Sequence, residues 1–147
     1  MYNNQCEQII QIPNLLLSLT KLYNYKPNIH INNEQDQQSI QIREKSRDCL
    51  NEIQSQGDEY AQAELINVGL GKALIIRISS AGGTEEQGDK EMEQGLQFIF
   101  EILNQLNKGK NNYYDFYPSF PAQPALSQSY IEQVEEEGGI EEPKDKY

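Results

Sequence analysis

The chain has few cysteines and no long apolar run, and both shortages narrow its class. Two cysteines in 147 residues, Cys6 and Cys49, are too few for a disulfide framework, so we expect free thiols in a reducing compartment. No stretch reaches the roughly 18 consecutive apolar residues that a membrane-spanning helix needs. The apolar N-terminal stretch has no basic residues before it, so it does not resemble a secretory signal. We therefore expect a cytoplasmic protein that does not insert into a membrane.

Basic residues are also scarce. The 12 lysines and arginines face 23 aspartates and glutamates, which gives a formal net charge of −11. A surface with this charge repels the phosphates of nucleic acids and of anionic lipids. We expect no nucleic-acid partner, and a protein as the partner instead.

Apolar residues at helical spacing are the main signal that the sequence does contain. A helix is expected to start near Pro13, and a second to run from about residue 38 to 56 and end at Gly57 in a left-handed cap. Asp58 can cap a short third helix that Gly69 terminates. The pattern predicts an all-α protein.

A fourth helix, over about residues 70–80, is apolar almost all round, so other elements should surround it. Its "IIRI" (75–78) could equally be a buried strand, but no other convincing strand would pair with it. Thr84 and Gln87 have the spacing of a capping box for the helix that follows.

The strongest helix signal covers residues 90–107 and has two apolar faces. The first face repeats at alternating spacings of four and three, with Met92, Leu96, Ile99, Leu103 and Leu106. Phe98, Phe100 and Ile102 add the second. Such a helix needs partners on two sides.

The run "NVGLGKALII" (67–76) raises the possibility of a phosphate-binding loop. A P-loop requires glycine where Ile66 stands and serine or threonine where Ala73 stands. A dinucleotide-binding turn requires a third glycine where Leu74 stands. The run therefore indicates a joint between two helices, with Gly69 as the stop and Lys72 facing solvent.

Other candidate chemistry is weak. His30 has no companion ligand at metal-binding spacing, and Cys49 lies on an apolar helix stripe that predicts a buried thiol. The acidic stretch 132–142 could attract calcium, although a solvated charge run is the simpler interpretation. We assign no catalytic, cofactor-binding or metal-ligating residue and no cofactor. An enzymatic function remains an alternative only if the fold brings together carboxylates from distant segments.

After residue 117 the composition changes to proline, serine, glutamine and glutamate, which is typical of an irregular tail. A short helix in "SQSYIEQVEEE" (127–137) is an alternative. Just before this change, "NNYYDFYPSF" (111–120) is the densest aromatic cluster. It would either pack on the preceding helix or anchor a partner.

Residues 47–117, about half the chain, resemble an armadillo-type helical repeat. The stretches "QAELINVGLGKALIIRISS" and "EMEQGLQFIFEILNQLNKGKNNYYDFY" are most similar to the central helical (RIH-type) region of inositol trisphosphate and ryanodine receptor calcium-release channels. The matching positions are Leu65, Gly69, Leu74, Ile75, Ile78, Leu96, Ile99, Leu103, Asn107, Phe116 and Tyr117. The resemblance implies a right-handed helical solenoid fragment of about four to five helices.

On this resemblance, residues 1–117 form the armadillo-like domain and residues 118–147 a Pro-rich, acidic, flexible tail. The ligand-binding cluster of basic residues in those channels has no counterpart, since Arg43, Lys45 and Arg47 are the nearest approach to one. What the resemblance implies is a non-enzymatic scaffold, a segment of a larger assembly that binds neighbouring repeats on the cytosolic side of an internal membrane. The alternative is a small independent adaptor that binds a protein through its aromatic segment and acidic tail.

Overall fold

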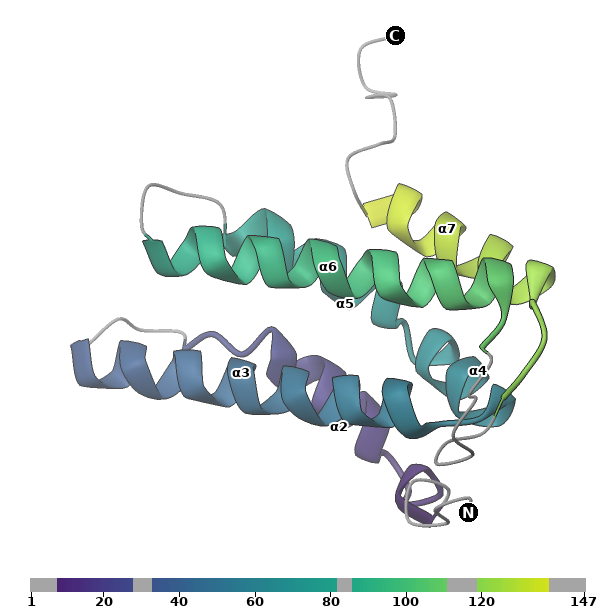
Figure 1. The fold of residues 1–147 in the computed structure, drawn as a ribbon. Coiled ribbons are helices and arrows are strands. Elements are labelled where there is room, and N and C mark those ends of the chain that lie inside the picture. The colour runs from purple at the N-terminus through teal and green to yellow at the C-terminus, as the bar shows by residue number, and fades with distance from the viewer. Residues whose placement is uncertain (1–7, 28–32, 82–85, 111–118, 138–147) are drawn as a thin grey trace, which may run out of the picture.

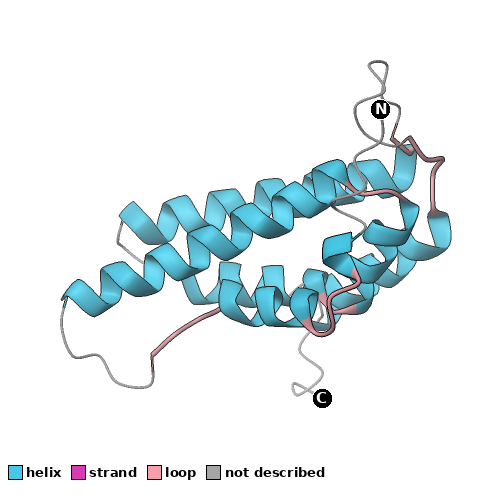
Figure 2. Ribbon diagram, turned by 90° about the horizontal axis from the view of Figure 1, so that it is seen from below, coloured by secondary structure: helices cyan, strands magenta, loops and turns pink. Residues whose placement is uncertain are grey.

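The computed structural model describes residues 8–27, 33–81, 86–110 and 119–137. These residues form mainly helices (Figures 1 and 2), namely α2 (Leu15–Tyr23), α3 (Asn33–Gln56), α4 (Glu59–Asn67), α5 (Leu70–Ala81), α6 (Glu86–Lys108) and α7 (Pro124–Glu137). Within the described residues, Lys110 and Phe120 form an isolated antiparallel β-bridge. The all-α prediction is confirmed, and the strand alternative for residues 75–78 is wrong because they lie inside α5.

Helix α5 lies at the centre of the arrangement. The long helices α3 and α6 run in the same direction in Figure 1, α2 lies against α3, and α5 lies against α6. Helix α5 also contacts α2, α4 and α7. Leu70 and Leu74 of α5 have no exposed surface. Packing around this apolar helix is therefore extensive but not complete, because Lys72 and Ile76 on its other side are exposed.

The core consists of apolar side chains from each of these helices. Its buried members include Leu16 and Tyr23 from α2, Leu50 and Ile53 from α3, Ala61, Leu65 and Ile66 from α4, Phe98, Ile99, Ile102 and Leu106 from α6, and Tyr130 from α7. Burial of such side chains contributes roughly 1.5–3 kcal/mol each before the entropy of ordering is subtracted.

The short helix α4 has the ends that the sequence predicts. The Asp58 carboxylate accepts a hydrogen bond from the Ala61 N–H at 3.0 Å, which satisfies one of the free donors of the first turn. Gly69 follows α4 with a φ of +89°. Gly57 differs from the prediction, because it does not have the positive φ of a left-handed cap. Its N–H instead continues the α3 pattern by donating to the Ile53 carbonyl at 2.9 Å.

Three helices start at positions other than those predicted. Helix α2 starts at Leu15 after Asn14, which has a φ of 64°, so Pro13 lies outside the helix. Helices α3 and α6 start earlier, at Asn33 and Glu86, because glutamate and glutamine extend a helix at little cost where apolar spacing gives no signal. The predicted capping box cannot be compared, since Thr84 lies outside the described residues.

Helix α7 confirms the helix that was the alternative for residues 127–137, so an irregular structure is wrong for residues 124–137. Leu126, Tyr130 and Val134 follow one another at four-residue spacing and form a narrow apolar stripe on it. Tyr130 is 1% exposed, and Leu126 and Val134 pack against the core. Glu132, Glu135 and Glu136 are exposed, so acidic composition and helix formation coexist here. Residues 138–147, the rest of the predicted tail, lie outside the described residues.

The central position of α5 leads to a prediction about stability. Replacing the fully buried Leu74 with alanine should lower the free energy of unfolding by about 2–5 kcal/mol, because the neighbouring helices cannot collapse into the cavity. Ile76→Ala on the same helix is the matched control and should cost less than about 1 kcal/mol. Urea unfolding followed by circular dichroism measures both. Equal losses in the two variants would contradict the central burial of α5.

Candidate functional site

Three ionised side chains from three helices meet in the interior. Glu91 of α6 lies between Arg43 of α3 and Arg77 of α5, and we call this group the Arg–Glu–Arg cluster. Arg43 donates from Nε and Nη2 to Glu91 Oε1, at 3.2 and 3.0 Å. The Arg77 Nε lies 3.4 Å from Glu91 Oε2. The side chains of Arg43, Arg77 and Glu91 are 14%, 8% and 7% exposed, so solvent screens this cluster little.

The cluster also has neutral neighbours. Arg43 donates from Nη1 to the Tyr25 carbonyl at 3.1 Å, just after the end of α2. Tyr23, the last residue of α2, borders the same small cavity as the three charged side chains. Burial raises the pKa of the Tyr23 phenol to about 12. Burial also lowers the pKa of the Arg77 guanidinium, and the charge of Glu91 opposes that change.

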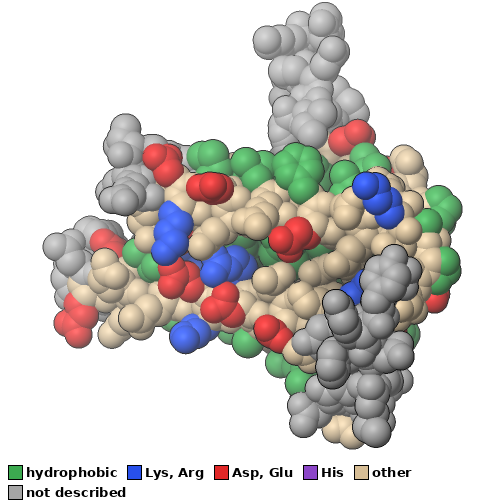
Figure 3. Space-filling model, viewed as in Figure 1, with side chains coloured by type: hydrophobic (Ala, Val, Ile, Leu, Met, Phe, Trp, Pro, Cys, Tyr) green, Lys and Arg blue, Asp and Glu red, His purple; other side chains and the backbone are tan. Residues whose placement is uncertain are grey.

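A cleft of about 340 Å³ opens beside the cluster. Lys26, Arg43 and Arg77 line it together with Asp36 and Glu91. Its other lining residues are Pro27, Ser39, Ile40, Ser80, Gln87 and Gly88, and the last two belong to the first turn of α6. Figure 3 shows basic and acidic side chains together on the face between α3 and α6, towards the beginning of both helices. We call this space the charged cleft.

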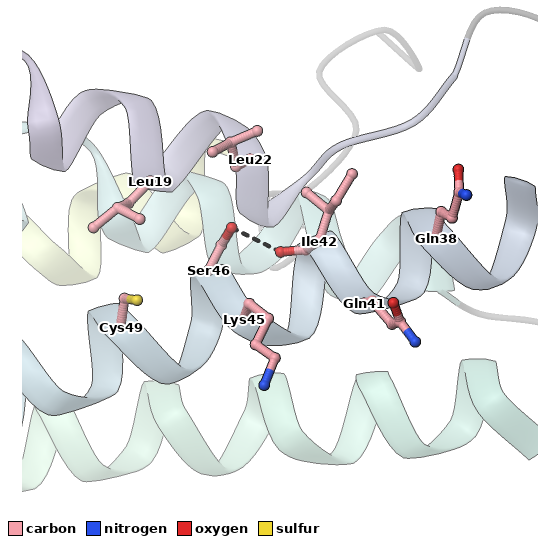
Figure 4. A pocket seen from close by; sticks show the side chains of 8 residues that line it. All are labelled: Leu19, Leu22, Gln38, Gln41, Ile42, Lys45, Ser46 and Cys49. Carbon is pink, nitrogen blue, oxygen red and sulfur yellow. Dashed lines mark hydrogen bonds between the residues drawn. The ribbon is translucent and has the colours of Figure 1, made fainter.

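A second, mainly apolar groove lies between α2 and α3 and has a volume of about 590 Å³. Figure 4 shows its eight lining side chains, with Leu19 and Leu22 from α2 and Gln38, Gln41, Ile42, Lys45, Ser46 and Cys49 from α3. The Ser46 hydroxyl donates to the Ile42 carbonyl of its own helix at 2.8 Å. Its proton is therefore already hydrogen-bonded within the protein. We call this space the α2–α3 groove.

Cys49 is exposed in this groove, so the prediction of a buried thiol is wrong. The helix stripe that enters the core passes through Ser46, Leu50 and Ile53. Cys49 lies about 100° around the helix from Leu50, because each residue of an α-helix turns by that angle. The apolar stripe predicted from the sequence therefore covers a wider part of the α3 surface than the part that packs against the core.

Both apolar faces predicted for α6 are only partly covered. Ile99 and Leu106 of the first face and Phe98 and Ile102 of the second are buried. Leu96 of the first face is 41% exposed and Phe100 of the second 63%. Figure 3 shows hydrophobic side chains along the edge of the molecule where α5 and α6 lie. We call Leu96 and Phe100 the outer face of α6.

The run that resembled a phosphate loop is a helix joint, as predicted. Gly69 takes the left-handed conformation that glycine adopts without a steric cost, and it ends α4. Gly71 is already inside α5, where an added Cβ would lie 3.1 Å from the Tyr130 ring of α7. Lys72 is exposed, as predicted. Each glycine therefore has a structural reason, one for the turn and one for helix contact.

Other sequence candidates lie outside the described residues. Cys6, His30 and residues 111–118 of the aromatic cluster are among them, as is the acidic stretch from residue 138 onward. Within the described ranges, no group of three or more histidine, cysteine, aspartate or glutamate side chains is placed to hold a metal ion. None of the helices described is long and apolar enough to cross a membrane.

The Arg–Glu–Arg cluster was not predicted from the sequence. One signal for it existed, because Arg77 is one of only two charged residues in an otherwise apolar α5. A buried arginine requires a counter-charge. The sequence could not identify Glu91 as the partner, since two other acidic residues of α6, Asp89 and Glu93, lie within one helical turn of it.

No protein-family model, no curated protein and no solved structure matches the chain. The resemblance to the helical region of calcium-release channels accordingly stays a prediction.

The cluster predicts an asymmetric response to loss of its carboxylate. Glu91→Gln should lower the free energy of unfolding by about 3–5 kcal/mol, because it leaves two buried guanidinium groups without their shared counter-charge. Glu93→Gln on the exposed side of α6 is the matched control and should change stability by less than about 0.5 kcal/mol. Denaturant titration compares the two, and a similar small effect in both variants would contradict a buried cluster.

The buried phenol of Tyr23 predicts a loss of stability at alkaline pH. The unfolded chain ionises this group near its ordinary pKa of 10.0, whereas the folded protein keeps it neutral up to about 12. The unfolded state therefore binds fewer protons between these values, and the stability that is complete below pH 10 is lost as the pH rises through 12. Thermal unfolding of the wild type and Tyr23→Phe from pH 8 to 11.5 tests this. The variant should fall less steeply above pH 10, and parallel curves would exclude the effect.

Proposed function

We propose that the chain is a non-enzymatic helical module that binds a protein through the outer face of α6. The observation that carries the proposal is the 63% exposure of Phe100, a large aromatic side chain in the middle of a 23-residue helix. Aromatic side chains of this kind often contribute the largest share of binding energy at protein interfaces. Leu96, one helical turn earlier and 41% exposed, extends the same apolar surface.

The two-sided pattern of α6 supports this assignment. One apolar side of the helix is covered by α5 and α7 within the chain. Leu96 and Phe100 have no comparable cover from the part of the chain that the structure describes. In helical repeat proteins, such a face is buried by the next repeat or by a terminal cap. A neighbouring helical unit that presents an apolar surface is therefore the partner that we propose.

In its finer form, the proposal is an armadillo-like solenoid unit related to the cytosolic helical region of calcium-release channels. A short α4 that ends at Gly69, an apolar α5 and a leucine-rich α6 follow one another as in that resemblance. The finer proposal includes a cytoplasmic location, on the cytosolic face of an internal membrane through a partner.

An independent adaptor is the second candidate. The α2–α3 groove favours it, because an apolar groove of about 590 Å³ between two helices can accept the apolar side of a partner helix. In that case Leu22, which is 41% exposed, would be the contact side chain on α2.

The proposed binding face can be tested without knowing the partner. Phe100→Ser should reduce the binding of an apolar fluorescent dye and any concentration-dependent self-association, because it removes most of the exposed apolar surface of α6. Dye fluorescence and sedimentation velocity measure the two effects. The free energy of unfolding should change by less than about 1 kcal/mol, since the side chain is mostly in water.

Tyr60→Ser provides the matched control. Tyr60 is a 52% exposed aromatic residue on α4, away from α6 in sequence, and its removal should leave dye binding and sedimentation unchanged. A wild-type protein that sediments as a monomer at all concentrations and binds no dye would contradict the proposal. A loss of dye binding in Leu22→Ser but not in Phe100→Ser would favour the adaptor instead.

A further inference from the structure

Among the described residues that line it, the charged cleft has one more basic side chain than acidic side chains. Lys26, Arg43 and Arg77 contribute three positive charges, and Asp36 and Glu91 contribute two negative charges. The local sum is +1, in a chain whose formal net charge is −11. This local excess of positive charge can attract an anion, because the cleft lies next to buried groups whose charges water screens weakly.

The two arginines of the cleft differ in how many hydrogen bonds they make within the protein. Arg43 uses Nε and Nη2 on Glu91 and Nη1 on the Tyr25 carbonyl. Arg77 has one described ionic partner, Glu91, and its Nε finds no acceptor with hydrogen-bond geometry. With 7% of its surface exposed, Arg77 is a buried donor that is incompletely satisfied. This Nε has almost no accessible surface and faces Glu91, so an arriving acceptor would meet the two terminal nitrogens of Arg77 instead. These nitrogens make no hydrogen bond with the described residues, and an acceptor would satisfy them.

We propose that the charged cleft binds the carboxylate group of a small molecule, with Arg77 as the main donor and Lys26 at the rim. Guanidinium groups match the planar geometry of a carboxylate. A single negative charge neutralises the local sum of +1. A phosphate with nearly two negative charges would leave an excess beside Asp36 and Glu91.

The shape of the cleft and the first turn of α6 agree with this ligand class. A volume of about 340 Å³ lies at the lower end of the range for small-molecule sites. Gln87 and Gly88 line the cleft from the first turn of α6, at the positive end of the helix dipole, which the acidic residues Glu86 and Asp89 of the same turn already offset in part. The site uses residues other than the outer face of α6, so it is independent of the proposed protein-binding function.

Sodium acetate, titrated into the full chain against sodium chloride at equal ionic strength, tests the site. The readout is the arginine Nε–H signals in ¹H–¹⁵N spectra, with the Arg77 signal assigned by its absence in Arg77→Lys. Acetate should shift this signal saturably, with a Kd in the millimolar range, and chloride should not. Lys26→Ala should weaken binding by roughly threefold, the effect of removing one exposed charge.

Lys45→Ala is the matched control, because it removes an exposed lysine from α3 that lines the α2–α3 groove instead. It should leave the acetate titration unchanged. Equal shifts in acetate and chloride would overturn the proposal, as would equal weakening in the two lysine variants. A parallel titration with inorganic phosphate decides the ligand class. Saturation of the same signal at a lower concentration of phosphate would overturn the carboxylate assignment.

Discussion

The burial of α5 is the constraint on which the rest of the fold depends. Most of the first nine residues of this helix are apolar, so most of its surface has to be covered by other helices. The helices α2, α4, α6 and α7 provide that enclosure, and Leu70 and Leu74 lose all contact with water. The approach of α7 is close enough that Gly71 leaves only just the room for the Tyr130 ring. The position of each neighbouring helix can therefore be understood from the surface of α5 that it covers.

Enclosing α5 also encloses Arg77, and this explains the main polar feature of the interior. A guanidinium in that position requires a carboxylate, which Glu91 supplies from α6, and Glu91 is shared with Arg43 from α3. Replacement of a buried ion group by apolar residues often preserves or raises stability, so the cluster is weak support for stability as such. The cluster instead fixes the position of these helices relative to one another. The bonds at Glu91 constrain how far α3 and α6 can slide past each other, which apolar contacts alone would specify less tightly.

Local chemistry was predictable from the sequence, and long-range pairing was not. Asp58 and Gly69 act within one helical turn, so their residue types were enough to assign the ends of α4. Arg77 and Glu91 lie on different helices, and which acidic residue of α6 faces α5 depends on the packing of the whole core. Cys49 and Tyr130 illustrate the same limit in opposite directions. The apolar stripe on α3 predicted a buried thiol, but Cys49 is exposed. The acidic composition after residue 117 predicted an irregular, solvated segment, but Tyr130 is only 1% exposed.

The enclosure of α5 has a consequence for how the chain is made. Two of the helices that cover it, α6 and α7, follow it in sequence, and Tyr130 is synthesised about 60 residues after Leu70. At the usual 5–20 residues per second of translation, α5 waits on the order of several seconds for its last cover. During that interval the leucines of α5 can contact other nascent chains.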